Sequence, residues 1–276
     1  MNLSKVDILG VSISIQKKYE LVNYIENYLK NVTKFPLTIV TPNPEQIVYA
    51  QKDEHFRQLL NSADIALPDG IGIVWAAKRL QSNAPQPPLK IRGGEGRVMK
   101  VIPGIEFMED LVKLAAENGY LVGLIGGRNG VAAEALERLQ QKFPALKGWA
   151  EDAPEVRISN FKFQISNLNA QQYFEKLLKQ IQNSETKLLF IGLGAPKQEY
   201  FTANLKSQIP NPKFSKPLVL MSVGGSFDEL SGRILRAPQW VNSLGIKWLW
   251  RLILEPWRVN RQLRLITFIR SVLSSV

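Results

Sequence analysis

The sequence of 276 residues contains no cysteine and one histidine. Disulfides, thiolate metal ligands and thiol nucleophiles are therefore excluded, and a reducing compartment is allowed. Long apolar runs are also missing, because no window reaches the roughly 18 apolar residues that cross a bilayer. The first residues lack the basic-then-apolar plan of a signal peptide, so we expect a cytoplasmic protein.

Acidic residues are scarce in the C-terminal segment, residues 232–276. The net charge of the chain is +11, and this segment holds eight basic residues against one acidic residue, Glu255. Excess positive charge attracts the phosphates of nucleic acids, lipid headgroups or nucleotides. Because the charge is confined to a Trp-rich tail, the pattern favours a peripheral protein on an anionic membrane surface and no nucleic-acid partner. A helix with a solvated basic face is the alternative.

Short apolar runs that end in small or turn residues alternate with stretches of helical spacing. This pattern predicts an α/β fold, a Rossmann-like and largely parallel sheet flanked by helices, with a basic helical C-terminal appendage. The expected strands cover residues 6–13, 37–43, 63–70, 120–127, 186–194 and 218–225. The expected helices cover residues 15–30, 44–62, 107–118, 130–143 and 170–183.

Composition also divides the chain. We expect a catalytic domain over residues 1–231 and an appendage over residues 232–276, with helices at 241–255 and 257–274 separated by Pro256. Residues 81–103, rich in Pro, Gly and basic side chains, are typical of a loop beside a site. Residues 151–167 have the appearance of an insertion.

Two predicted strands end in polar residues that suit a reactive site. Asp69 follows an apolar run in LPDG, where a carboxylate can accept the proton of an attacking hydroxyl, although Pro-Asp-Gly alone is usually a plain turn. Thr41 and Asn43 follow another run, and their hydroxyl and amide groups can bind a sugar or a base. Asn43-Pro44 is equally typical of a helix N-cap.

Two further strand ends are rich in glycine. Gly126 and Gly127 precede a predicted helix, whose free backbone N–H groups attract phosphate, although the spacing differs from a GxGxxG fingerprint. In the other, Gly194 allows close approach to a ligand, Lys197 can offset diphosphate charge and Gln198 can bond a sugar or base. Lys197 can also be an exposed residue of a first helical turn. Because ligands bind beyond the carboxyl ends of parallel strands, we expect these four strand ends to share one rim.

Metal chemistry finds little support in the sequence. The single histidine, His55, lies in a polar helical stretch and is expected at the surface. No DxD pair suits a nucleotide-bound divalent ion, and five-residue spacing places Asp64 and Asp69 on opposite faces of a strand. We therefore predict no metal site and no cofactor.

The motifs taken together resemble the WecG/TagA/CpsF family, glycosyltransferase family 26. They run in order over most of the chain: TPNPEQIVYA, ADIALPDGIGIV, GLIGG, FIGLGAPKQE, SVGGSFDELSG and RAPQW followed by WLWRLILEPWR. The resemblance implies an inverting, metal-independent transferase that moves N-acetylmannosamine or its uronic acid from a UDP donor to undecaprenyl-diphosphate-linked N-acetylglucosamine. Such an enzyme serves cell-surface polysaccharide or teichoic acid synthesis at the inner face of the membrane.

The same resemblance implies roles for individual residues. Asp69 matches the proposed base, while Thr41, Asn43 and Gln198 match substrate contacts. The family's appendage binds membrane and its arginines are proposed to hold the lipid diphosphate. The matching arginines are Arg236, Arg251, Arg258 and Arg261.

One departure supports a second hypothesis. Val101 aligns with an arginine that the family places near the donor diphosphate, and Arg92, Arg97 or Lys100 would have to replace it. A catalytically degenerate member that binds polyprenyl-linked intermediates is thus the alternative to a transferase, followed by a non-enzymatic nucleic-acid or membrane-binding module. The sequence leaves open whether the protein forms a homo-oligomer.

Overall fold

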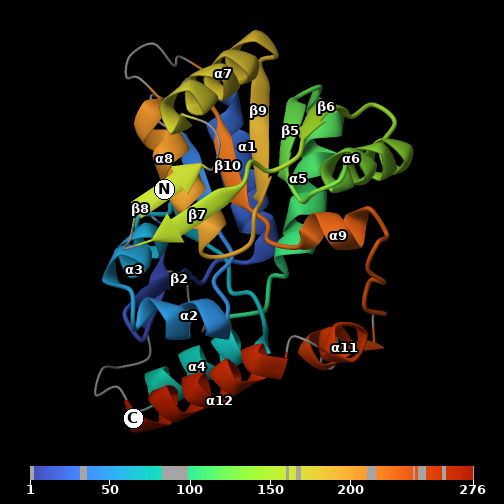
Figure 1. Ribbon diagram of the computed structural model, residues 1–276. Coiled ribbons are helices and arrows are strands. Elements are labelled where there is room, and N and C mark those ends of the chain that lie inside the picture. The colour runs from blue at the N-terminus through green and yellow to red at the C-terminus, as the bar shows by residue number, and fades with distance from the viewer. Residues whose placement is uncertain are drawn as a thin grey trace. The chain divides into compact units, whose positions relative to one another are not determined.

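The computed structural model describes residues 3–31, 36–82, 99–159, 162–165, 169–209, 216–238, 240–241, 247–256 and 259–275. The chain divides into two compact units, each built from segments that are distant in sequence (Figure 1). The first unit comprises Met1–Glu20, Thr41–Pro103 and Leu235–Val276, and the second comprises Leu21–Val40 and Gly104–Ile234. Helix α1 (Lys18–Lys30) begins in the first unit and continues in the second.

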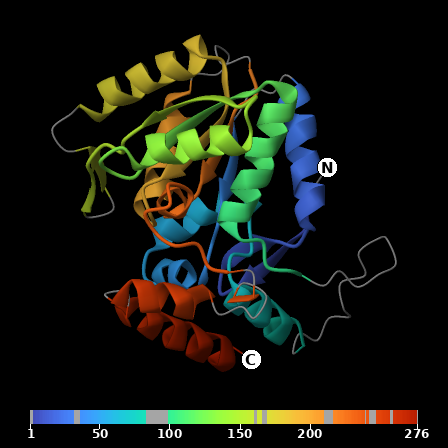
Figure 2. The same ribbon diagram turned by 90° about the vertical axis from the view of Figure 1, so that its right-hand side faces the viewer.

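The second unit contains a parallel sheet, which confirms the predicted fold class. Its strands run in the order β3 (Leu37–Val40), β10 (Val219–Ser222), β9 (Thr186–Gly192), β5 (Leu121–Gly126) and β6 (Lys147–Glu151). Strands β3 and β10 are buried throughout, as expected where helices cover both faces of a parallel sheet. Helices α1 and α5 (Gly104–Asn118) lie on one face, with α7 (Ala170–Asn183) and α8 (Lys197–Gln208) on the other (Figure 2).

A β-hairpin and two more helices complete the second unit. Strands β7 (Val156–Ser159) and β8 (Lys162–Ile165) pair antiparallel, and Val156 and Ile165 enter the core formed with Phe174 of α7 and Phe201 of α8. The rings of Phe174 and Phe201 lie 5.1 Å apart, centroid to centroid. This hairpin is the structure of the segment that the sequence suggests is an insertion. Helices α6 (Val131–Lys142) and α9 (Ser226–Leu230) follow the carboxyl ends of β5 and β10.

The first unit is smaller and mainly helical. It contains β1 (Lys5–Ile8), β2 (Val11–Ser14), β4 (Ile65–Ala66), α2 (Pro44–Ala50), α3 (Glu54–Asn61), α4 (Ile71–Ser82), α11 (Lys247–Leu254) and α12 (Val259–Ser274). Helix α12 packs on α2 and α4 with Phe268 and Val272 fully buried. The appendage therefore contributes to the core of this unit.

Three local expectations are wrong. Residues 6–13 form an antiparallel hairpin rather than one strand, because Leu9 and Gly10 both have positive φ and reverse the chain. Residues 44–62 form two helices, since the Asp53 carboxylate accepts the N–H of Phe56 at 2.9 Å and begins a new helix. Residues 63–70 contain only the two-residue strand β4.

Other expectations keep the status of predictions. Most of the expected loop at residues 81–103 lies outside the described residues. The predicted boundary after residue 231 separates a catalytic domain from a membrane-binding appendage. The two compact units are defined by packing alone and do not test this boundary, so it stays a prediction.

Candidate functional site

In the first unit, the predicted base lies beside the predicted sugar-binding residues. The backbone N–H of Asp69 donates to the carbonyl of Pro42 at 3.3 Å, between Thr41 and Asn43. Thr41 is buried and Asp69 is half-buried. The Asn43 side chain accepts the N–H of Gln46 at 3.0 Å, so Asn43 is the N-cap of α2. Two of the four predicted strand ends therefore meet here.

The two glycines after Asp69, Gly70 and Gly72, are each required by the structure for a different reason. Gly70 has φ +95°, a left-handed conformation that turns the chain into α4. A Cβ on Gly72 would lie 2.9 Å from Pro44 Cγ and 3.8 Å from Phe268 Cε1. Gly72 thus lets α4, the helix that follows the Asp69 turn, pack closely against α2 and α12.

In the second unit, the other two strand ends meet through glycine backbone. A Cβ on Gly126 would lie 2.6 Å from the carbonyl oxygen of Gly192, and Gly127 N–H donates to that oxygen at 3.2 Å. Gly126 is therefore required by the close approach of β5 to β9. Gly194 also has a left-handed φ of +75°, with open space around its α-carbon.

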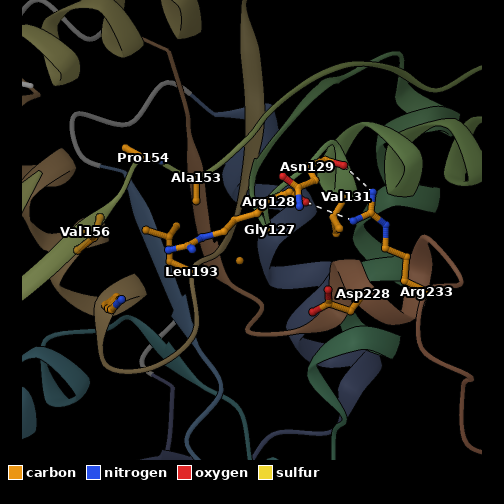
Figure 3. Close-up of a pocket in the computed structure, with 12 residues that line it drawn as sticks. Gly127, Arg128, Asn129, Val131, Ala153, Pro154, Val156, Leu193, Asp228 and Arg233 are labelled. Atoms are coloured by element: carbon orange, nitrogen blue, oxygen red, sulfur yellow. Dashed lines mark hydrogen bonds between the residues drawn. The ribbon is translucent and has the colours of Figure 1, made fainter. Parts of the chain in front are cut away.

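These strand ends border a pocket of about 400 Å³, shown in Figure 3. Its lining consists of Gly127, Arg128, Asn129, Val131, Ala153, Pro154, Val156, Gly192, Leu193, Lys197, Asp228 and Arg233. The side chain of Arg128 extends from the turn after β5 towards Leu193 (Figure 3). The cationic side chains of Arg128 and Lys197 outnumber the single carboxylate of Asp228 in this lining, which makes the pocket suitable for an anion.

The backbone N–H of Gly130, at the helix start where we expected phosphate to bind, already has a protein partner. Both carboxylate oxygens of Asp152 accept the N–H of Gly130, at 3.0 and 3.1 Å, at the N-terminus of α6. The N–H of Ala153 also donates to the carbonyl of Gly127 at 3.3 Å. An anion in this pocket would therefore be held by side chains and by other N–H groups of the turn.

Gln198 is buried, and its amide contacts the protein on both sides. Its Oε1 accepts the N–H of Gly224 at 2.9 Å, and its Nε2 donates to Glu199 Oε1 at 2.8 Å. The amide orientation follows from the Gly224 N–H, which can only donate. Burial raises the pKa of the Glu199 carboxyl to about 7. Direct contact of Gln198 with a substrate stays a prediction. It would require the amide to give up its hydrogen bond to Gly224 or to Glu199 and to bind the substrate instead.

The predicted lipid-phosphate arginines are described only in part. Arg236 is exposed, and Arg251 Nε lies 3.9 Å from Glu255 Oε2 at the end of α11. Arg258 lies outside the described residues, and Arg261 is in α12 without a described side chain.

The sequence prediction missed three charged residues of the pocket. Arg128 lies inside a predicted glycine turn, and Arg233 entered the sequence analysis only as part of the net charge. Asp228 belongs to the SFDELSG motif, and this motif could have identified it as a site residue. Among the described residues, no three His, Asp or Glu side chains gather in a metal-binding group, and His55 is exposed.

No helix in the described part of the chain is long and apolar enough to span a membrane. Helix α12 nevertheless exposes apolar side chains, with 60% of Leu263, 49% of Ile266 and 50% of Leu273 accessible to solvent.

A family model and individual relatives both indicate the same family of glycosyl transferases. The family model described as glycosyl transferase WecG/TagA/CpsF matches residues 6–276. Relatives from Staphylococcus aureus strains MRSA252 and NCTC 8325 are each 31% identical over 260 residues, which cover 94% of this chain and 89% of the relative. Both are named N-acetylglucosaminyldiphosphoundecaprenol N-acetyl-beta-D-mannosaminyltransferase.

Proposed function

This chain belongs to the WecG/TagA/CpsF family of glycosyl transferases, and from that premise we propose which sugar it transfers and how. The donor is UDP-N-acetylmannosamine or its uronic acid, and the acceptor is undecaprenyl-diphosphate-linked N-acetylglucosamine. The transfer inverts the anomeric centre and requires no metal. The enzyme acts as a peripheral protein at the inner face of the cytoplasmic membrane.

The observation that carries the proposal is the pocket at the ends of β5 and β9. A nucleotide-linked sugar needs a site for its diphosphate, whose charge grows as the bond to the sugar breaks. Arg128 and Lys197 supply positive charge there without a metal ion, beside backbone that glycine brings close. Asp228 offers an acceptor for hydroxyl groups of the nucleoside.

In the proposed reaction, Asp69 is the general base. The acceptor hydroxyl attacks the anomeric carbon of the donor and passes its proton to the Asp69 carboxylate. The bond from the anomeric carbon to the phosphate oxygen breaks, and UDP leaves with the electron pair. A single displacement of this kind inverts the anomeric centre, and the half-buried position of Asp69 supports the role.

Substitution of Asp69 by Asn tests the reaction directly. The assay contains UDP-N-acetylmannosamine, a short-chain lipid-diphosphate N-acetylglucosamine and EDTA. We expect the rate of UDP release to fall about a hundredfold or more in the variant. Asp64→Asn is the matched control, because Asp64 is an exposed carboxylate five residues earlier, and it should keep full turnover. Unchanged turnover in Asp69→Asn would remove Asp69 as the base.

A second function rests on the resemblance described under Sequence analysis. That resemblance aligns Val101 with an arginine that the family is expected to have near the donor diphosphate. A catalytically degenerate member would bind the nucleotide sugar and release no UDP with any lipid-linked acceptor. The assay above separates the two functions when it is combined with a measurement of UDP binding.

We propose that the C-terminal segment holds the enzyme on anionic lipid, with Arg236, Arg251, Arg258 and Arg261 near the acceptor diphosphate. The exposed apolar residues of α12 support contact with lipid, as do the exposed basic residues Arg264 and Arg270 on the same helix.

A further inference from the structure

Arg233 connects two parts of the second unit that are far apart in sequence. Its Nε and Nη2 donate to the two carboxylate oxygens of Glu134, at 2.8 and 2.7 Å. Its Nη1 and Nη2 also donate to the carbonyls of Arg128 and Asn129, at 3.4 and 2.5 Å (Figure 3). Four hydrogen bonds therefore join this guanidinium to the first turn of α6 and to the turn that precedes it.

The turn held by Arg233 has an unusual backbone. Gly127, Asn129 and Gly130 have φ values of +67°, +56° and +80°. Asn129 has a side chain, so this left-handed conformation costs energy that surrounding bonds must offset. The turn also forms one wall of the proposed diphosphate pocket.

The peptide between Asn129 and Gly130 is bonded on both sides. Its carbonyl accepts from Arg233, and its N–H donates to the Asp152 carboxylate at 3.0 Å. The preceding carbonyl, that of Arg128, also accepts from Arg233. Because N–H and C=O point in opposite directions across a trans peptide, these bonds fix the direction of the N–H of Asn129 as well.

We propose that Arg233 is a positioning residue for the donor: together with Glu134 and Asp152 it holds the turn at residues 127–130 so that Arg128 and the turn's backbone face the diphosphate of a nucleotide. Four of the five N–H groups of the guanidinium are already directed at the protein. Arg233 thus contributes geometry rather than a free charge. The identity of the ligand rests on the proposed function.

A simple surface ion pair would behave differently. The side chains of Arg233 and Glu134 are 37% and 45% exposed, and exposed pairs contribute little to folding. We therefore expect Arg233→Ala to lower the thermal unfolding midpoint by less than about 4 °C. The affinity for the nucleotide should decrease more than the stability, because in Arg233→Ala the carbonyls of Arg128 and Asn129 lose their hydrogen bonds to the guanidinium.

The experiment measures UDP binding to the full chain by calorimetry. We expect the Kd of Arg233→Ala to rise about tenfold over wild type, with a raised KM for the donor and little change in kcat. Arg233→Lys should give a smaller loss, since lysine offers donors without the planar fork. Lys142→Ala, which breaks the 2.9 Å pair with Glu109 at the other end of α6, is the control and should bind like wild type.

Amide hydrogen exchange without ligand tests the same inference independently of UDP. Exchange at residues 127–130 should become faster in Arg233→Ala and remain unchanged in Lys142→Ala. If exchange in this turn is the same in Arg233→Ala as in wild type, or if UDP binds both equally, the positioning role is overturned. If wild type binds no UDP while the exchange rates differ as expected, the positioning of the turn stands and the proposed donor is wrong.

Discussion

Glu199 is a fully buried acid in the first turn of α8, and it accepts a hydrogen bond from Gln198. Loss of hydration raises the pKa of its carboxyl from an ordinary 4.5 to about 7. The folded protein therefore holds a proton here that the unfolded chain releases between these pH values. Linkage requires the free energy of unfolding to fall as pH rises through this window and to stay lower above it.

Glu199→Gln should remove this dependence on pH. Between pH 5 and pH 8 we expect the wild type to lose about 3 kcal/mol more unfolding free energy than the variant. Urea unfolding at both pH values measures the difference. Glu137→Gln, a change of an exposed glutamate on α6, should behave as wild type. Equal losses in wild type and Glu199→Gln would show that Glu199 titrates at its ordinary pKa.

Asn43 shows how one residue can serve structure and chemistry at once. Its side chain caps α2, and such a cap contributes about 1 kcal/mol to stability. The N-cap reading of Asn43-Pro44 is therefore confirmed, while contact with a substrate stays a prediction. Any loss of activity on substitution of Asn43 has to be compared with the accompanying loss of stability.

At the scale of elements, α12 presents two different faces. Phe268 and Val272 are buried against α2 and α4, whereas Leu263, Ile266 and Leu273 are exposed. A helix that only packed on the body would carry polar residues on its outer side. The proposed contact of α12 with a membrane interface rests on these exposed apolar residues and on the neighbouring arginines.

Substitution of Ile266 and Leu273 by Ser should therefore weaken binding to vesicles. Each side chain exposes about half of its surface, so the pair should cost roughly 2 kcal/mol, or about thirtyfold in the partition coefficient. Vesicle flotation measures this change. Tyr19→Ser is the control, because Tyr19 is 58% exposed on α1, outside the C-terminal segment. A double variant that floats like wild type would contradict membrane contact through α12.

At the scale of the whole molecule, charge is the property that matters most. The chain has a net charge of +11, and much of the excess lies in residues 232–276. A surface charge of this size attracts anionic lipid over a distance set by the salt concentration. In the proposed function this charge contributes to affinity for the membrane, and it has no part in the choice of fold.

Salt should release the protein from anionic vesicles. Raising the ionic strength from about 0.1 M to about 1 M shortens the Debye length from about 10 Å to about 3 Å. We expect the bound fraction on phosphatidylglycerol vesicles to fall steeply, and binding to neutral phosphatidylcholine vesicles to be weak at both concentrations. Cosedimentation measures both. Binding that is independent of salt and lipid charge would show that electrostatic attraction has no part in it.

Much of the architecture could be predicted from local patterns. The apolar runs at β3, β5, β9 and β10 and the helical spacing at α7 lie in short stretches of chain, where alternation and periodicity carry the signal. The predictions failed where a few residues decide the outcome, as at Asp53, whose cap divides a helix, or at Leu9 and Gly10, which reverse a strand.

The motifs likewise indicated the family and most candidate residues, because each motif is a contiguous stretch of chain. Tertiary contact alone decides how those stretches meet. Asp69 bonds to Pro42, Gly126 packs against Gly192, and Arg233 bonds to the carbonyl of Arg128 from 105 residues away. Local propensity says nothing about such pairs, since their geometry depends on how the intervening strands and helices pack.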